Sequence, residues 1–379
     1  MLIEQRSWSA ETGWVVTRTS GNMASAQLVL FFGARAAIAT SRTIETLRAW
    51  HPGARIVGCS TAGEICETHV SDGTVVATAI CFEHTEVRVA CEPLNSAGDS
   101  AGVGERIGRR LDAADLVHVV VLAEGLNVNG SELVTGLRRG LPEHVAVTGG
   151  LAGDGARFEQ TDVFCDGELA GRAVAAIAFY GDRLEVGCGS KGGWDSFGPD
   201  RLVTRSKANV LYELDGSSAL ELYKKYLGAH AANLPLSGLF FPLSLRGETA
   251  DQRVVRTILG VDEDAGSLVF AGDIPQGSYA RLMRTNVDRV IDGAEDAATA
   301  CTEPPGSAAP AFGLLISCVG RKLVLMQRIE EEVESVRNVL GDDAILSGFY
   351  SYGEIAPFAS STRCALHNQT MTITTFTER

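Results

Sequence analysis

The sequence predicts an α/β protein made of two related domains, each with mixed sheets covered by helices. Three observations lead to this prediction: apolar runs of strand length alternate with amphipathic helical segments, a strand-helix-strand-glycine-loop unit recurs, and the chain of 379 residues contains 42 glycines. Repeated strand-helix-strand units place strands side by side with helices on their faces. Hydrophobic residues make up 45% of the chain, which is enough for buried cores.

A glycine-rich loop motif occurs twice with the same spacing and a third time in a looser form. Residues 58–65 read Gly-Cys-Ser-Thr-Ala-Gly-Glu-Ile, and residues 348–355 read Gly-Phe-Tyr-Ser-Tyr-Gly-Glu-Ile. Residues 149–154, Gly-Gly-Leu-Ala-Gly-Asp, resemble both. Because each copy follows an apolar run, we interpret the repetition as a duplicated unit rather than a solenoid array.

The first half of the chain contains two of these units. A strand at 28–32, a helical segment at 41–50 and a strand at 55–57 form the first, and strands at 74–79 and 83–91 follow it. The second unit comprises 116–122, 131–141 and 145–147, and a continuous apolar strand at 174–180 follows.

A helix at 100–112 lies between these two units. It contains Gly102, Gly104 and Gly108, which resemble a dinucleotide-binding fingerprint, but the last spacing is one residue too long. The motif also begins well beyond the preceding strand, so we expect these glycines to serve close packing between helices.

The second half begins with a helix at 217–227 and ends with the third unit. A composition change at 205–216 divides the chain into domains of residues 1–205 and 206–379. Further predicted elements are strands at 254–259 and 268–270, a long helix over 283–298, a strand at 313–319, an amphipathic helix over 326–340 that ends at Gly341, and a closing strand at 365–376. In that last strand, alternation puts His367 on an inward-facing apolar side.

Charge and composition exclude several classes of function. The formal net charge of −14 argues against binding to nucleic acid or to an anionic membrane surface. We expect no membrane insertion, because no apolar run approaches the roughly 20 residues that cross a bilayer. The first residues lack the pattern of a signal peptide, and the nine cysteines are scattered. We therefore expect a soluble cytoplasmic protein in a reducing compartment.

Four motifs in this order resemble the signature loops of the FIST sensory proteins. Residues 58–65 and 149–155 are similar to the loops of the N-terminal FIST domain, and 351–355 and 366–370 to those of the C-terminal one. The resemblance covers nearly the whole chain, so residues 1–205 and 206–379 would be these two domains. It implies a small-ligand sensor in signal transduction.

One stand-alone branch of the family is similar in length and in the run 194–228, and it includes haem proteins that sense nitric oxide and regulate partner histidine kinases. The resemblance thus makes haem the most specific candidate cofactor. A histidine kinase or a cyclic-di-nucleotide enzyme is the expected partner. His367 is the candidate axial ligand, with a hydrogen-bonded structural role as its alternative and His230 as the next candidate.

The alternative ligand is an amino acid or a related small metabolite. Glu354 and Glu64 at the glycine loops would accept hydrogen bonds from an ammonium group, or would instead cap the loops themselves. We favour the C-terminal copy because it contains aromatic residues and is close in sequence to His367. The expected ligand-binding residues are Glu354, Tyr352, Ser351, Asn368, Glu64, Thr61 and Asp154.

The remaining alternatives are a scaffold that binds only proteins and a Cys or Ser hydrolase. Residues 58–63 are one residue too long for a Gly-x-Ser-x-Gly nucleophile elbow, and no paired base can be assigned. Cys59 at a strand end is typical of packing. No close pairs of Cys or His ligands suggest a zinc site. We therefore predict a protein that is not an enzyme.

Overall fold

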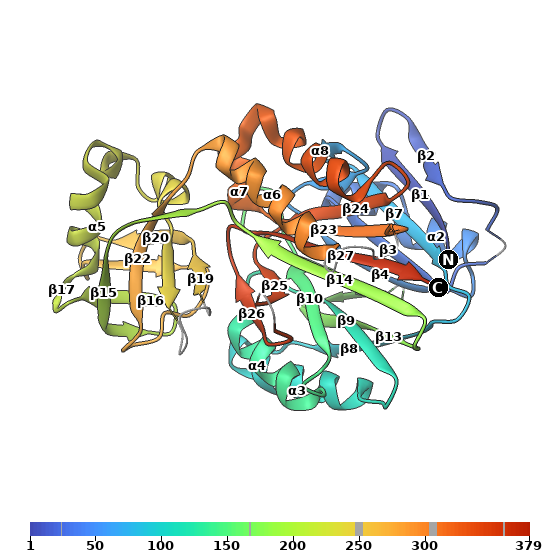
Figure 1. Ribbon diagram of the computed structural model, residues 1–379, viewed down its shortest axis with the longest axis horizontal. Helices are drawn as coiled ribbons and strands as arrows, with labels where there is room; N and C mark the ends of the chain where they lie inside the picture. The colour runs from blue at the N-terminus through green and yellow to red at the C-terminus, as the bar shows by residue number, and fades with distance from the viewer. Residues whose placement is uncertain (24, 167, 247–252, 303–308, 359–360) are drawn as a thin grey trace.

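The structure is mixed α/β, which confirms the predicted fold class, and it consists of a large body and a smaller lobe (Figure 1). The lobe is formed by residues 195–284, and the chain before and after these residues builds the body. This computed structural model describes the whole chain except residues 24, 167, 247–252, 303–308 and 359–360.

Each of the three sheets of the body is built on one pair of parallel strands. The predicted strand-helix-strand units supply these pairs. They are β3 (Leu28–Gly33) with β4 (Arg55–Ser60), β9 (Leu116–Ala123) with β10 (Ala146–Leu151), and β23 (Phe312–Cys318) with β24 (Ile345–Ser351).

Helical segments connect the two strands of each pair. In the third unit Gly341 ends the last helix with a φ of 88°, and its N–H donates to Arg337 O, so the predicted glycine cap is confirmed. The connecting segments are α1 (Arg35–Thr40) and α2 (Thr43–Trp50), then α4 (Gly130–Gly140), then α7 (Val319–Leu325), a 3-10 turn (Met326–Arg328) and α8 (Ile329–Leu340).

Antiparallel strands extend each sheet on the side of the first parallel strand. β7 (Val75–Cys81) pairs with β3, β13 (Ala173–Tyr180) with β9, and β27 (Met371–Glu378) with β23. The outer strands are β1 (Leu2–Ser9) and β2 (Gly13–Thr19) in the first sheet, β8 (Glu86–Pro93) in the second and β14 (Leu184–Lys191) in the third.

Short strands that follow the glycine loops cross from one sheet to another. The strand after each loop pairs not with its own unit but with the second parallel strand of a different unit, and a further short strand follows it. β5 (Glu64–Cys66) joins β24 and carries β6 (His69–Ser71), β11 (Val163–Cys165) joins β4 and carries β12 (Glu168–Gly171), and β25 (Glu354–Pro357) joins β10 and carries β26 (Cys364–His367). Every sheet of the body therefore combines distant parts of the chain.

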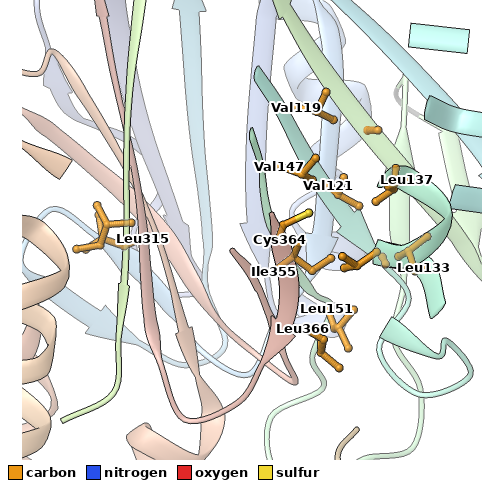
Figure 2. Packing of buried hydrophobic residues seen from close by; sticks show 14 of the residues in the cluster. Val119, Val121, Leu133, Leu137, Val147, Leu151, Leu315, Ile355, Cys364 and Leu366 are labelled. Carbon is orange, nitrogen blue, oxygen red and sulfur yellow. The ribbon is translucent and has the colours of Figure 1, made fainter. Parts of the chain in front are cut away.

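This exchange builds shared cores. Figure 2 shows Val121 of β9 and Val147 of β10 in one apolar cluster with Leu133 of α4 and with Ile355 and Leu366 of the exchanged strands. All of these side chains are buried, and burying such a side chain contributes about 1.5–3 kcal/mol. The exchange is thus stabilised by side chains as well as by strand pairing.

The glycines of the fingerprint-like motif serve helix packing, as predicted. α3 (Ser100–Leu111), preceded by a 3-10 turn (Ala97–Asp99), lies against α4. A Cβ on Gly104 would lie 2.3 Å from Leu133 O, and a Cβ on Gly136 would lie 1.9 Å from Ala101 O. Only glycine allows the two backbones to approach this closely.

The lobe has its own sheet and its own apolar core. Residue 205, where the composition changes, lies inside the first lobe strand. The lobe elements are β15 (Asp195–Lys207), β16 (Val210–Leu214), β17 (Ser217–Ser218), α5 (Ala219–Leu227), two 3-10 segments (Gly228–Asn233 and Leu236–Phe240), β18 (Leu243–Arg246), β19 (Arg253–Arg256), β20 (Ile258–Asp262), β21 (Ser267–Phe270) and β22 (Tyr279–Arg284).

Three expectations from the sequence are wrong in detail. The strand expected at 254–259 is interrupted at Thr257, between β19 and β20. The long helix α6 (Val287–Cys301) does not include Met283, which lies in β22 because the chain is still completing the lobe sheet there. The closing strand is not continuous but breaks between β26 and β27, where Gln369 adopts a φ of 61°. This break turns Asn368 out of the regular strand.

Polar contacts join the lobe to the body. Arg256 of β19 donates a hydrogen bond to Leu366 O of the body at 2.9 Å. It donates a second one, within the lobe, to Asp273 O at 3.1 Å. The Asp273 carboxylate accepts a hydrogen bond from Asn129 Nδ2 of the body at 3.1 Å. Gln369 Nε2 donates to Leu239 O of the lobe at 3.3 Å. These bonds hold the lobe beside the turn that contains Asn368.

A fully buried ion pair lies where the chain leaves the body for the lobe. Arg321 Nη2 and Glu332 Oε2 are 2.7 Å apart, and neither side chain is exposed. Arg321 also donates to Gly192 O and Val290 O, each at 2.7 Å. Its hydrogen bonds therefore anchor the segment just before the lobe. None of the helices in the described part of the chain is long and apolar enough to cross a membrane.

Candidate ligand-binding site

The three glycine loops meet and hydrogen-bond to one another through their backbones. Each loop is bonded to both of the others, so the bonds form a closed ring. The bonds are Ala62 N to Tyr350 O and Tyr350 N to Gly63 O (both 2.8 Å), Leu151 N to Gly353 O (2.8 Å) and Tyr352 N to Leu151 O (3.2 Å), and Gly153 N to Ser60 O (2.9 Å) and Gly155 N to Thr61 O (3.0 Å).

Glycine is required in this ring. Gly63 has a φ of 140°, which side-chain-bearing residues rarely adopt. At Gly153 a Cβ would lie 2.6 Å from Ala62 N, inside the neighbouring loop. The glycines of the repeated motif therefore allow loop-to-loop contact.

The two glutamates of the motif have equivalent partners in the two halves of the chain. Glu64 accepts hydrogen bonds from the Thr61 hydroxyl and from Thr74 N and Oγ1, the last two at 2.9 and 2.7 Å. Glu354 accepts from Ser351 Oγ at 2.6 Å and from Thr370 N and Oγ1 at 3.2 and 3.0 Å. Both carboxyl groups thus fasten a loop to the start of the next long strand.

Burial dominates the electrostatics of both glutamates. Glu64 is 1% exposed and Glu354 is 0% exposed, and burial raises the pKa of each to about 7. Neither lines a described cavity, so the structure places Glu64, Thr61, Glu354 and Ser351 in the loop framework.

Asp154 and His367 also lie in this framework. Asp154 is buried and bonds to the Arg157 guanidinium, and its backbone N–H donates to Tyr352 Oη at 3.0 Å. His367 Nε2 lies 3.2 Å from Ala356 O, across the β25–β26 pair. Burial and the charge of Arg256 lower the pKa of His367 to about 4, so its imidazole is neutral.

A cavity of about 330 Å³ opens between the body and the lobe, and it contains Tyr352 and Asn368. Its volume is at the small end of the range for ligand pockets. None of the sixteen described residues that line it carries a charged side chain. The body contributes Phe158, Cys318, Val319, Leu323, Tyr352 and Asn368, among others, and the lobe contributes Leu234, Pro235, Leu239, Thr257, Ile258 and Leu259.

Two buried polar groups in this cavity have no hydrogen-bond partner among the described residues. Asn368 is 0% exposed, and neither Oδ1 nor Nδ2 of its amide is bonded. Thr257, on the lobe side, is 4% exposed, and its hydroxyl is also unbonded. Leaving such a group unsatisfied costs about 1–3 kcal/mol. A ligand or an ordered water in the cavity would supply the missing partners.

Aromatic rings form one wall of the cavity. The rings of Phe158 and Tyr352 are stacked with centroids 4.3 Å apart and an interplanar angle of 15°. Tyr352 Oη donates to Gly155 O at 3.2 Å and accepts from the Phe158 N–H at 3.2 Å. The loop ring therefore fixes the position of this wall.

A second cavity of about 630 Å³ lies next to the first and shares Asn233 and Leu234 with it. His230 is exposed here, and its ring centroid is 5.5 Å from that of Phe241. Ser237 Oγ is buried without a partner among the described residues. This cavity combines an accessible imidazole with apolar walls.

Of the residues expected from the sequence, the structure brings only Tyr352 and Asn368 into the first cavity. Sequence reasoning missed Thr257, Phe158 and the apolar lobe residues. Phe158 lies only three residues beyond the loop at 149–155, which was a usable signal. Thr257 lies in a stretch without any motif, so nothing in the sequence pointed to it.

Comparisons with known proteins agree with the motifs. The FIST N domain matches residues 27–217 and the FIST C domain matches residues 219–357. A curated relative, Uncharacterized protein MJ1623 of Methanocaldococcus jannaschii, is 23% identical over 265 residues, which are 64% of this chain and 50% of that protein. This chain thus spans about half the length of that relative. A cyanuric acid hydrolase from A. caulinodans is 12% identical over 78% of this chain and 99% of its own, with a TM-score of 0.18, which carries no structural argument.

We expect Asn368→Leu to raise the free energy of unfolding of the ligand-free protein by about 1–3 kcal/mol, because it removes a buried amide that has no partner. Urea denaturation measures this change. Asn209→Leu is the matched control, since Asn209 Nδ2 donates to Phe270 O at 2.8 Å, and it should lower the free energy of unfolding. Equal destabilisation by both variants would show that Asn368 has a structural partner.

The raised pKa of Glu354 predicts a pH dependence of stability. The folded state favours the protonated carboxyl. The contribution of Glu354 to the free energy of unfolding is therefore complete below about pH 4.5 and is lost as the pH rises through about 7. In Glu354→Gln the unfolding free energy should fall less between pH 5 and pH 7.5 than in the wild type, by about 2 kcal/mol. Glu11→Gln, at an exposed position, is the control. Identical pH profiles for wild type and Glu354→Gln would contradict the assignment.

Proposed function

The chain belongs to the FIST family, whose domains are small-ligand sensory domains in signalling, and from this premise we propose that it binds a small molecule in the cavity at Asn368 and reports this binding to a separate signalling protein. One observation carries the proposal. The Asn368 amide is buried at that cavity with neither of its polar atoms bonded among the described residues. A ligand that bonds to this amide recovers the free energy that folding leaves uncompensated.

The output in this proposal is the position of the lobe. The cavity has one wall from the body and one from the lobe, so a bound molecule contacts both. Such a ligand favours the arrangement in which the lobe is docked on the body over any other arrangement. The size of this shift is set by the difference between the ligand's affinities for the docked and the undocked arrangement. The receiver would be a protein that contacts the lobe, and a histidine kinase or a cyclic-di-nucleotide enzyme is the class that we propose.

The proposed protein senses its ligand without converting it. Cys318 is the thiol in the cavity, and burial raises its pKa well above the usual range, so it stays protonated and is a poor nucleophile. His367 does not line the cavity and is hydrogen-bonded to Ala356 O. A reading as a Cys hydrolase therefore lacks an activated nucleophile at this site.

A thermal-shift screen of the purified protein against a metabolite library tests this proposal. At least one compound should raise the Tm of the wild type and fail to raise that of Asn368→Leu, and it should be recovered unchanged after incubation. Asn209→Leu should retain the response. A compound that stabilises wild type and Asn368→Leu equally would place the site elsewhere, and consumption of the compound would indicate an enzyme.

Haem is a second candidate, and His230 favours it. His367 does not fit as an axial ligand, since it is buried and hydrogen-bonded and lines neither described cavity. His230 fits better because its imidazole is exposed in an apolar cavity with Phe240 and Phe241. Haem iron held by one imidazole can bind nitric oxide at its open position.

The absorption spectrum of protein expressed with added haem tests this second candidate. We expect a Soret band that shifts with nitric oxide, disappears in His230→Ala and persists in His367→Ala. Loss of the band in His367→Ala alone would return the axial ligand to His367. A wild-type protein without any band would exclude haem, and the small-molecule proposal would stand.

A further inference from the structure

We propose that the ligand of the Asn368 cavity is an uncharged, flat heterocycle whose edge carries a hydrogen-bond donor next to an acceptor, as in a nucleobase or a cyclic amide. This inference rests on the proposed function and names the chemical class that the same cavity would bind. It is carried by the polar groups, the charge and the shape of the walls.

The first step is the hydrogen-bonding pattern of Asn368. Its side chain offers one acceptor oxygen and one donor NH₂ group side by side, and neither atom has a partner among the described residues. The complementary edge is therefore a donor beside an acceptor. Carboxamide side chains bind the edges of nucleobases by such paired hydrogen bonds.

The second step is the position of Thr257. Its unbonded hydroxyl belongs to the lobe, whereas Asn368 belongs to the body, and both residues line the same cavity. A hydroxyl can either donate or accept, so it can satisfy a further polar atom of a heterocyclic ring. A ligand with two polar edges would thus join the body to the lobe.

The third step is the lack of charge. The sixteen described lining residues include no Asp, Glu, Lys, Arg or His. An amino acid would have to bring its ammonium and carboxylate groups into this cavity without an ionic partner, which is costly. Glu64 and Glu354 cannot supply that partner, because both are buried in the loop framework and already hydrogen-bonded.

The fourth step is the aromatic wall. Phe158 is 42% exposed and is stacked on Tyr352, so it presents a ring to the cavity that both residues line. Its backbone φ of 56° is unusual for a bulky residue and is held by the bond from its N–H to Tyr352 Oη. Strained residues of this kind cluster at ligand sites. A flat ligand would stack on this ring while its edge reaches Asn368.

Isothermal titration calorimetry with a fixed panel tests this proposal. The panel contains uracil, thymine, cytosine, adenine, hypoxanthine and 2-pyrrolidone, with 1,3-dimethyluracil as the probe whose N–H donors are blocked and L-leucine and L-glutamate as charged probes. At least one unblocked heterocycle should bind the wild type. 1,3-Dimethyluracil should bind at least about tenfold more weakly than the best of them.

Variants then assign that binding to the cavity. Asn368→Leu should abolish it, Thr257→Val should weaken it, and Asn209→Leu should leave it unchanged, while a raised Tm shows that Asn368→Leu is folded.

Two outcomes overturn the heterocycle class and leave the sensor proposal standing. In the first, the blocked probe binds as well as the unblocked ones. In the second, only an amino acid binds, and Asn368→Leu loses that binding. If no heterocycle of the panel binds, the class is likewise overturned. If any ligand binds Asn368→Leu as well as wild type, the cavity itself is wrong and both proposals fail.

Discussion

The ring of backbone hydrogen bonds among the three glycine loops is the constraint on which the rest of the structure depends. Each loop has to reach its neighbours, so the strand that follows it leaves its own sheet and pairs in another one. This crossing is the reason that the segments matched as FIST N and FIST C share sheets and cores. Glycine makes the contact possible at positions such as Gly153, where any side chain would enter the next loop. The body therefore forms a single folded unit, although its sequence consists of three similar units.

The same ring separates framework from site. The side chains of Glu64 and Glu354 are buried, and each fastens a loop by accepting hydrogen bonds from hydroxyl and backbone donors. Desolvation of these two carboxyl groups raises their pKa. Tyr352 points the other way: its hydroxyl is bonded to the second loop and its ring forms the wall of the cavity. A wall on the body therefore faces a wall on the lobe, and polar contacts around Arg256 and Asp273 join the two parts.

The sequence was sufficient to predict the class of fold, the three units, the glycine cap of the last unit and the packing role of the glycines in α3. It also pointed to Tyr352 and Asn368, which line the first cavity, because their motifs lie beside a repeated loop. It could not separate ligand-binding carboxylates from loop-fastening ones, since both roles need an acid next to glycine. The exchange of strands between sheets could not be predicted from the sequence, because pairing between distant strands leaves no local periodicity. Thr257 was missed because a single hydroxyl between two ordinary strands becomes informative only when the opposite wall is known.

The lobe enters and leaves the body at adjacent points, since Asp195 pairs with Arg284 and Thr285 Oγ1 donates to Gly193 O at 2.7 Å. In topological terms the lobe is an insertion: its ninety residues interrupt a body whose three sheets and loop ring are complete without them. The cavity, by contrast, exists only when both parts are present. Recognition is thus shared between the body, which supplies Asn368, and the inserted lobe, which supplies the opposite wall. An insertion of this kind can diverge in sequence, and so exchange one ligand for another, without disturbing the scaffold that carries it.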